Sequence, residues 1–400
     1  MVNLFLLVGL GVVVFVGFNI GGSNTGVAFG PAVGSKSVSK SGAAVMMTVC
    51  FFVGGATVGR NVVATMGGKI VPSSYFTLTA SIVVLFFIGF ALFLANVVGV
   101  PASTSMTGVG SIAGLGLATG ALDWAVMGRI VAWWIVSPVI AFWVSGVIGR
   151  YFYPQLARWF AVTQTEGRLL KLDHSGPVPR PALGENTTQR EAVGTLVVIA
   201  VACYTAFSAG ASNMANAIAP LVGSEMISIN SGILIAGAAV GLGAFTIARR
   251  TIDTMGNDLT DMPLLAALVV AVVSSTLVTG LSWLGVPVSV VIISTMSIVG
   301  LGWGRATRTV TISDTIHGES PEVSVGALAA DGPGPTVGDS TSAPEATDPK
   351  PIGDEKARDL PSAADLFKPG ASARVIAMQN LVPALATLAS FLLFRFVPSL

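Results

Sequence analysis

The sequence predicts an all-α integral membrane protein with about ten transmembrane spans, arranged as two inverted-topology repeats with broken or re-entrant helices at the membrane midplane. Three observations support this prediction. Of the 400 residues, 52% are hydrophobic and only 10% are charged, whereas a soluble domain carries about 25% charged residues. Ten apolar runs divide the chain, and a motif near residue 21 returns near residue 210. This composition excludes a soluble enzyme and a nucleic-acid-binding protein.

The apolar runs define the candidate spans, since one span needs about 20 predominantly apolar residues. Two runs, Thr104–Thr119 and Ser289–Trp303, are short and glycine-rich, which is typical of discontinuous or re-entrant membrane helices. The first lysine is Lys36, so the apolar start lacks the basic segment of a signal peptide and should remain as the first span. The ten runs are Asn3–Ile20, Ala43–Val58, Phe76–Val98, Thr104–Thr119, Trp124–Ile148, Ala192–Ser208, Gly232–Ile247, Met262–Leu284, Ser289–Trp303 and Val375–Val397.

Five regions follow along the chain. We expect the first membrane repeat over residues 1–149, a cytoplasmic connection over 150–190, spans six to nine over 191–303, an insertion over 304–373 and the last span over 374–400. The insertion holds eleven of the 20 acidic residues and many Pro and Gly. Such a composition buries too little apolar area to offset the entropy of ordering, so the sequence predicts a disordered segment there.

The placement of Lys and Arg predicts the orientation, because positively charged loops are retained on the cytoplasmic side of the membrane. With the N-terminus outside, Lys36, the Arg150–Arg190 connection, Arg249 and Arg305 lie inside, while the loop of Arg60 disagrees. We therefore expect a multi-pass protein of the cell membrane with both termini outside.

An internal repeat is the strongest pattern in the sequence. Residues 21–35 and 210–224 align without gaps at an offset of 189, with identity at eight of fifteen positions. At an offset of 186, Gly99–Ser103 matches Gly285–Ser289. Because the first half contains five spans, an odd number, the second half enters the membrane the other way up. This is the inverted repeat of secondary transporters.

The repeated motifs have the composition of a polar break in a membrane helix. Glycines with Ser, Thr and Asn are expected to unwind the helix, whose freed N–H groups can hold an oxyanion and whose oxygens can hold Na⁺. The alternative is a helix-packing face of small residues. We expect Na⁺ ligands at Asn24 and Asn213. The candidate substrate- and ion-binding residues are Ser23, Asn24, Thr25, Ser103, Thr104, Ser105, Ser212, Asn213, Asn216 and Ser289.

Other chemistry finds no support in the sequence. Cys50 and Cys203 each lie in an apolar run, which predicts packed thiols. His174 and His317 have no neighbouring Cys or His, so we expect no metal site of that kind and no other cofactor. Since an enzyme needs paired carboxylates, a His/Cys cluster or a nucleophile with its base, we expect no catalytic residues and no enzymatic activity.

The motifs resemble the duplicated signature of the inorganic phosphate transporter (PiT) family, G-A-N-D-V-A-N-A. The similar segments are Asn19–Ser35 and Gly210–Ala217. Gly99–Ser105 is similar to the family's G-x-P-V-S-T-T turn, and Gly285–Ser289 resembles it more weakly. The resemblance implies cation-coupled uptake, usually with Na⁺ or H⁺, of phosphate and in some members sulfate. Both signatures read Ser-Asn where the family has Asn-Asp, so both carboxylates are replaced by amides.

Several alternatives remain open at this point. The substrate is inorganic phosphate in the favoured interpretation, and sulfate or another tetrahedral oxyanion in the second. A non-transporting membrane sensor or scaffold is the third. The expected partners are the oxyanion, the lipid bilayer and a second copy of the chain in a homo-oligomer, and we expect no nucleic acid.

Overall fold

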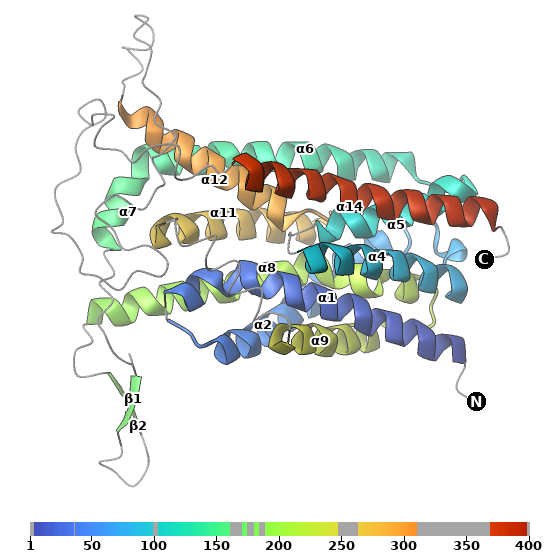
Figure 1. The fold of residues 1–400 in the computed structure, drawn as a ribbon, viewed down its shortest axis with the longest axis horizontal. Helices are drawn as coiled ribbons and strands as arrows, with labels where there is room; N and C mark the ends of the chain where they lie inside the picture. The colour runs from blue at the N-terminus through green and yellow to red at the C-terminus, as the bar shows by residue number, and fades with distance from the viewer. Residues whose placement is uncertain are drawn as a thin grey trace, which may run out of the picture.

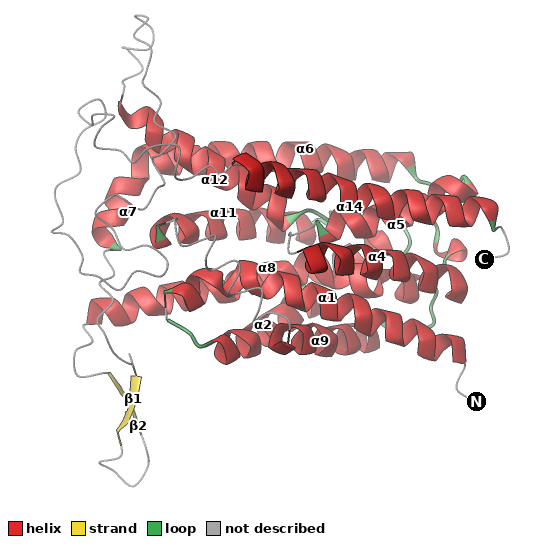
Figure 2. Cartoon of the chain, viewed as in Figure 1, coloured by secondary structure: helices red, strands yellow, loops and turns green. Residues whose placement is uncertain are grey.

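The computed structural model describes residues 4–35, 37–98, 103–160, 170–173, 180–183, 189–246, 263–309 and 369–397. These residues form an elongated helical bundle with one small antiparallel hairpin of strands, β1 (Leu170–Asp173) and β2 (Arg180–Leu183), at the periphery (Figures 1 and 2). The helices are α1 (Leu4–Gly34), α2 (Lys40–Ala56), α3 (Gly59–Met66), η1 (Ser73–Tyr75), α4 (Leu78–Val98), α5 (Thr104–Thr119), α6 (Trp124–Val147), η2 (Ile148–Phe152), α7 (Tyr153–Trp159), α8 (Gln189–Gly223), α9 (Ile229–Thr246), α11 (Leu264–Trp283), α12 (Val290–Ala306), η3 (Thr307–Thr309) and α14 (Pro369–Phe396).

Each of the ten apolar runs corresponds to a helix, which confirms the helical membrane fold. Within the described ranges, seven helices are long and apolar enough to cross a membrane, and the pair α2 and α3, bent by 60°, would make an eighth. Helices α5 and α12 have 16 and 17 residues, and at about 1.5 Å per residue they are too short to cross about 30 Å of hydrocarbon. The count of ten spans therefore stays a prediction.

The expected unwinding of the signature motifs is wrong. Helices α1 and α8 continue without interruption through residues 21–26 and 210–215. In α1 the polar side chains bond to the backbone of their own helix, since Asn24 Nδ2 donates to Ile20 O at 3.0 Å and Thr25 Oγ1 to Gly21 O at 2.7 Å. Such bonds let polar residues sit inside a membrane helix without opening it.

The predicted break before α12 is present, and α5 begins at a serine cap, although residues 99–102 of the predicted first turn lie outside the described residues. Ser103 and Ser289 are the N-caps of these helices, each accepting a backbone N–H at 3.3 Å. Gly285 begins the second turn with φ of 72°, a conformation that favours glycine. In Figure 1, α4 and α5 lie toward the end of the bundle that carries both termini, whereas α11 and α12 lie toward the other end.

Glycines of the two motifs make close helix contacts that recur at the repeat offset. A Cβ on Gly21 would collide with the carbonyl of Val240 in α9, and a Cβ on Gly210 would collide with the carbonyl of Phe51 in α2. Both pairs are related by 189 residues, so α1 packs on the second half and α8 on the first. The packing interpretation therefore holds for these glycines.

Figure 1 shows α1 and α8 crossing the bundle in opposite directions, with both chain ends on the same side. The recurring contacts and these directions support the inverted relation of the two halves, which stays a prediction. Cys50 and Cys203 are free thiols, both half-buried, and Cys203 Sγ lies 4.0 Å from Met46 Sδ. Most of the acidic insertion, along with His174 and His317, lies outside the described residues.

Candidate functional site

The candidate site lies where α1 and α8 meet the first residues of α5 and the turn before α12. Asn213 Nδ2 donates a hydrogen bond to Asn24 Oδ1 at 3.3 Å, although 189 residues separate them. Both side chains are buried, with exposed fractions of 2% and 8%. The residues that correspond in the two motifs therefore face each other inside the bundle.

Three donors converge on the side-chain oxygen of Asn213. Thr104 Oγ1 donates to it at 2.5 Å, Ser105 Oγ at 3.2 Å and Asn216 Nδ2 at 3.3 Å. An amide oxygen has two lone pairs, so this arrangement offers more donors than its resident acceptor can satisfy. Thr104 and Ser105 open α5, and the start of a helix carries partial positive charge. We call Asn213, Asn216, Thr104, Ser105 and Ser212 the polar cluster.

Ser212 ties the polar cluster to the turn before α12. Its hydroxyl donates to Val288 O at 2.8 Å and lies 3.1 Å from Ser105 Oγ. The remaining predicted residues bond elsewhere: Ser103 and Ser289 cap their helices, Ser23 Oγ donates to Ile20 O at 3.2 Å, and Thr25 bonds within α1. The structure thus brings together Asn24, Thr104, Ser105, Ser212, Asn213 and Asn216 through side-chain contacts.

Asn216 carries an acceptor without a partner. Its side chain is fully buried, and Oδ1 forms no hydrogen bond within the described structure. This oxygen lies against Gly108 of α5, where an added Cβ would come within 2.5 Å of it. Sequence reasoning missed Gly108, because only the contact across the two helices shows why a side chain is excluded there.

The polar cluster contains no charged side chain. Among the described residues, no group of three or more His, Cys, Asp or Glu could hold a metal ion. Oxygen ligands for a hard cation are present, since Asn24 and Asn213 supply amide oxygens. In addition, α1 and α8 contain Pro31 and Pro220, and because proline has no N–H, the backbone carbonyl four residues before each proline lacks its helical hydrogen bond.

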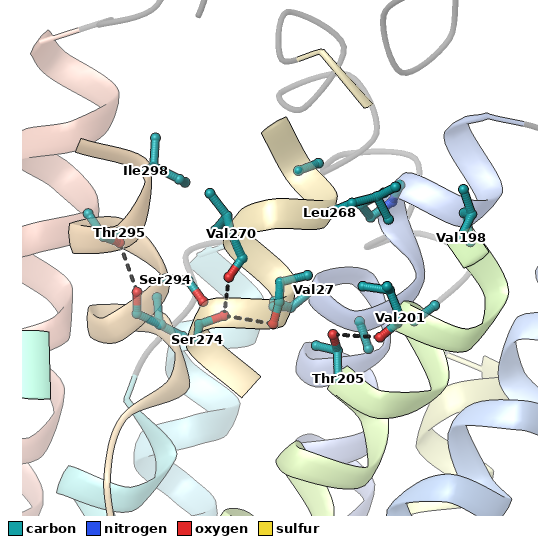
Figure 3. A pocket seen from close by; sticks show the side chains of 17 residues that line it. Val27, Val198, Val201, Thr205, Leu268, Val270, Ser274, Ser294, Thr295 and Ile298 are labelled. Carbon is teal, nitrogen blue, oxygen red and sulfur yellow. Dashed lines mark hydrogen bonds between the residues drawn. The ribbon is translucent and has the colours of Figure 1, made fainter. Parts of the chain in front are cut away.

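A cavity of about 220 Å³ lies between α1, α8, α11 and α12 (Figure 3). Its α1 wall begins at Val27, one turn beyond Asn24, in the C-terminal part of α1, and in Figure 1 this helix runs away from the end of the bundle that carries the termini. Most of the lining is aliphatic, with hydroxyls from Thr205, Ser274, Ser294 and Thr295. The sequence does not single out these four residues, because single hydroxyls in apolar helices have no distinctive pattern.

Comparison with known proteins decides the family. The model of the phosphate transporter family matches residues 20–318. The chain belongs to this family. The match spans both signature motifs and confirms the predicted resemblance, so the chain is a multi-pass membrane protein of a transporter family.

Relatives within the family carry different names. The sulfate permease CysP of Bacillus subtilis is 30% identical over 292 residues, covering 73% of this chain and 75% of the relative. A Helicobacter pylori protein named "Putative phosphate permease" is 25% identical over 361 residues, covering 73% and 67%. A solved structure described as the sodium-dependent phosphate transporter superposes with a TM-score of 0.67 over the whole of both chains at 16% identity, which shows a common fold.

Proposed function

We propose that this family member is a secondary active transporter of inorganic phosphate, coupled to Na⁺ or H⁺ and without enzymatic activity. The observation that carries the proposal is the convergence of three donors on Asn213 Oδ1. An oxyanion offers several acceptor oxygens, so an arriving anion could take the donors that now share one amide oxygen. Bonds from neutral donors to an anion are stronger than those to a neutral acceptor.

The absence of fixed charge in the polar cluster favours an anion in a second way. A carboxylate about 4 Å from a bound anion would repel it by about 4 kcal/mol per pair of unit charges at an effective dielectric constant near 20. The replacement of both signature carboxylates by Asn24 and Asn213 removes this repulsion. A coupling Na⁺ would then be held by amide and carbonyl oxygens alone, with Asn24 and Asn213 supplying the amide oxygens.

Alternating access would connect the polar cluster to the two faces of the membrane in turn. The cavity begins beside Val27, one turn beyond Asn24, and is lined by the C-terminal part of α1, which in Figure 1 points away from the end of the bundle that carries the termini. With both termini outside the cell, as the Lys and Arg pattern predicts, this cavity is the cytoplasmic entrance. The connection over 150–190 and the insertion over 304–373 would then lie in the cytoplasm, and the cell membrane is the proposed location.

Sulfate is the second candidate, because the 30% identical relative from Bacillus subtilis is named a sulfate permease. Phosphate and sulfate share tetrahedral geometry, but phosphate near neutral pH still carries a P–OH donor. The unpartnered Asn216 Oδ1 is an acceptor for such a donor. This favours phosphate, since sulfate has no O–H group at neutral pH that could donate a hydrogen bond to Asn216 Oδ1.

Uptake into proteoliposomes tests the proposal. Labelled phosphate should accumulate with an inward Na⁺ or H⁺ gradient, and unlabelled phosphate or arsenate should compete better than sulfate or molybdate. Preferred competition by sulfate would transfer the function to the second candidate. No uptake of either anion by correctly folded protein would favour a membrane sensor or scaffold and contradict the transport proposal.

A further inference from the structure

The two halves of the chain differ in polarity at positions that correspond in the repeat. At the offset of 189, Asn216 corresponds to Val27, and at the offset of 186, Thr104 and Ser105 correspond to Val290 and Val291. Three hydrogen-bonding side chains on one side of the pseudo-symmetry are therefore matched by three valines on the other. Such an exchange is informative because Val and Thr have similar volumes but differ in hydrogen bonding.

The structure places the three hydrogen-bonding side chains in the polar cluster and two of the three valines in the cavity wall, while Val290 packs in a buried apolar cluster. Thr104, Ser105 and Asn216 all donate to Asn213 in the polar cluster. Val27 and Val291, in contrast, line the largely aliphatic cavity. One side of the site thus presents convergent donors, and the corresponding side presents methyl groups.

The paired Asn residues also differ in their bonding. Asn24 Nδ2 donates to the backbone of its own helix at Ile20 O, and Asn24 Oδ1 accepts from Asn213. Asn213 Nδ2 instead donates to Asn24, and Asn213 Oδ1 receives two donors from α5 and one from Asn216 of its own helix. Ser23 and Ser212 repeat the difference, since Ser23 bonds to Ile20 O and Ser212 bonds across to the α12 turn.

We infer that the anion binds on one side of the pseudo-symmetry only, with Asn213, Asn216, Thr104 and Ser105 as its ligands, and that Asn24 and the valine side contribute no anion ligand. This inference rests on the proposed function and adds to it which half of the paired site carries the substrate. The hydroxyls of Thr104 and Ser105 and the amide of Asn216 rotate from Asn213 Oδ1 to the anion oxygens. One chain therefore binds one anion.

Reciprocal substitutions in the purified full-length chain test the inference, with equilibrium binding of labelled phosphate as the readout. Thr104→Val gives α5 the side chain found in α12, and it should weaken binding about tenfold or more, as expected for one lost hydrogen bond to a charged group. Val290→Thr is the matched control in α12 and should leave the dissociation constant within about twofold. Thr104→Ser keeps the hydroxyl and should recover most of the affinity that Thr104→Val loses.

The same assay compares the paired amides. At saturating Na⁺, where a weakened cation site is still filled, Asn213→Ala should weaken phosphate binding at least tenfold more than Asn24→Ala, and wild-type protein should saturate at one anion per chain. Equal losses from the two Asn variants, equal effects of Thr104→Val and Val290→Thr, or saturation at two anions would overturn the one-sided site. Thermal unfolding of each variant identifies misfolded protein. If a variant misfolds, the difference in phosphate affinity between Thr104→Ser and Thr104→Val decides whether the hydroxyl of residue 104 binds the anion. Wild-type protein that binds neither phosphate nor sulfate would contradict the proposed function instead.

Discussion

Restoring a carboxylate at Asn213 separates the contribution of charge from that of hydrogen bonding. In Asn213→Asp the new carboxylate accepts from Thr104 at the present 2.5 Å and from Ser105 at 3.2 Å. It keeps the donors in place but sets a negative charge where the amide was neutral. The donation to Asn24 Oδ1 is also lost, which leaves two oxygens facing each other.

The size of the effect follows from the geometry of the polar cluster. An anion that takes the Thr104 and Ser105 hydroxyls would lie about 4 Å from the new carboxylate, where repulsion is about 4 kcal/mol per pair of unit charges at an effective dielectric constant near 20. This corresponds to a loss of affinity of nearly a thousandfold, since about 1.4 kcal/mol is tenfold. A bound Na⁺ would offset most of this repulsion, so the loss should shrink steeply as Na⁺ rises.

Binding of labelled phosphate to purified protein, titrated at low and high Na⁺ with choline as the replacement cation, measures the effect. Asn230→Asp is a matched control, because Asn230 is exposed and its Oδ1 accepts a hydrogen bond from Arg60, and an exposed charge is screened. We expect weak binding and strong Na⁺ dependence for Asn213→Asp alone. Unchanged affinity at low Na⁺ would refute the placement of the anion beside Asn213.

Four further predictions test the packing, the cavity, the polar cluster and the insertion. Gly210→Ala should lower the free energy of unfolding by about 1–3 kcal/mol through overpacking, whereas Gly11→Ala should not, because Gly11 has open space around it. Thermal unfolding in detergent compares the two variants, and equal stability would contradict the close contact. Ser294→Cys, in a background without the native cysteines, should react with an impermeant thiol reagent only from the cytoplasmic face, and labelling from outside would reverse the proposed orientation. Gly108→Ala should displace Asn216 and reduce phosphate preference over sulfate in competition assays; an unchanged ratio would remove Asn216 from selectivity. Deletion of residues 320–368 should leave uptake and unfolding temperature largely intact, and misfolding would show that the insertion packs.

The sequence predicted the helical elements well because apolar length alone determines them. The predicted and observed bounds of α5 are identical, Thr104–Thr119, since a serine cap marks its start and Gly120 its end. The short helix α3 was missed because its eight residues are amphipathic and fall within a loop by hydropathy. The continuity of α1 was missed because Asn24 and Thr25 look like helix breakers until their bonds to the preceding turn are known.

The repeat offset predicted that Asn24 and Asn213 occupy corresponding positions, and their direct contact in the structure is what that correspondence would produce at a central axis. The hydrogen-bond partners of the paired motif residues were not predictable from the sequence. The two serines occupy equivalent positions in the repeated motif, but Ser23 bonds within its own helix, whereas Ser212 contacts Ser105 of α5 and the turn before α12. The cavity was invisible for a related reason, since Val27 and Val291 are ordinary core residues until the space between their helices is seen.

The reciprocal packing of α1 on α9 and of α8 on α2 has a consequence for biogenesis. Gly21 and Gly210 each find their close neighbour in the opposite half of the chain. When the first half leaves the ribosome and enters the bilayer, α1 and α2 therefore lack the helices that cover them. Their partner helices are synthesised only more than a hundred codons later. The insertion machinery or surrounding lipid must shield these faces meanwhile. Synthesis of the second half from a separate message should still complete the bundle, because the contacts that join the halves lie in the membrane and need no continuous chain.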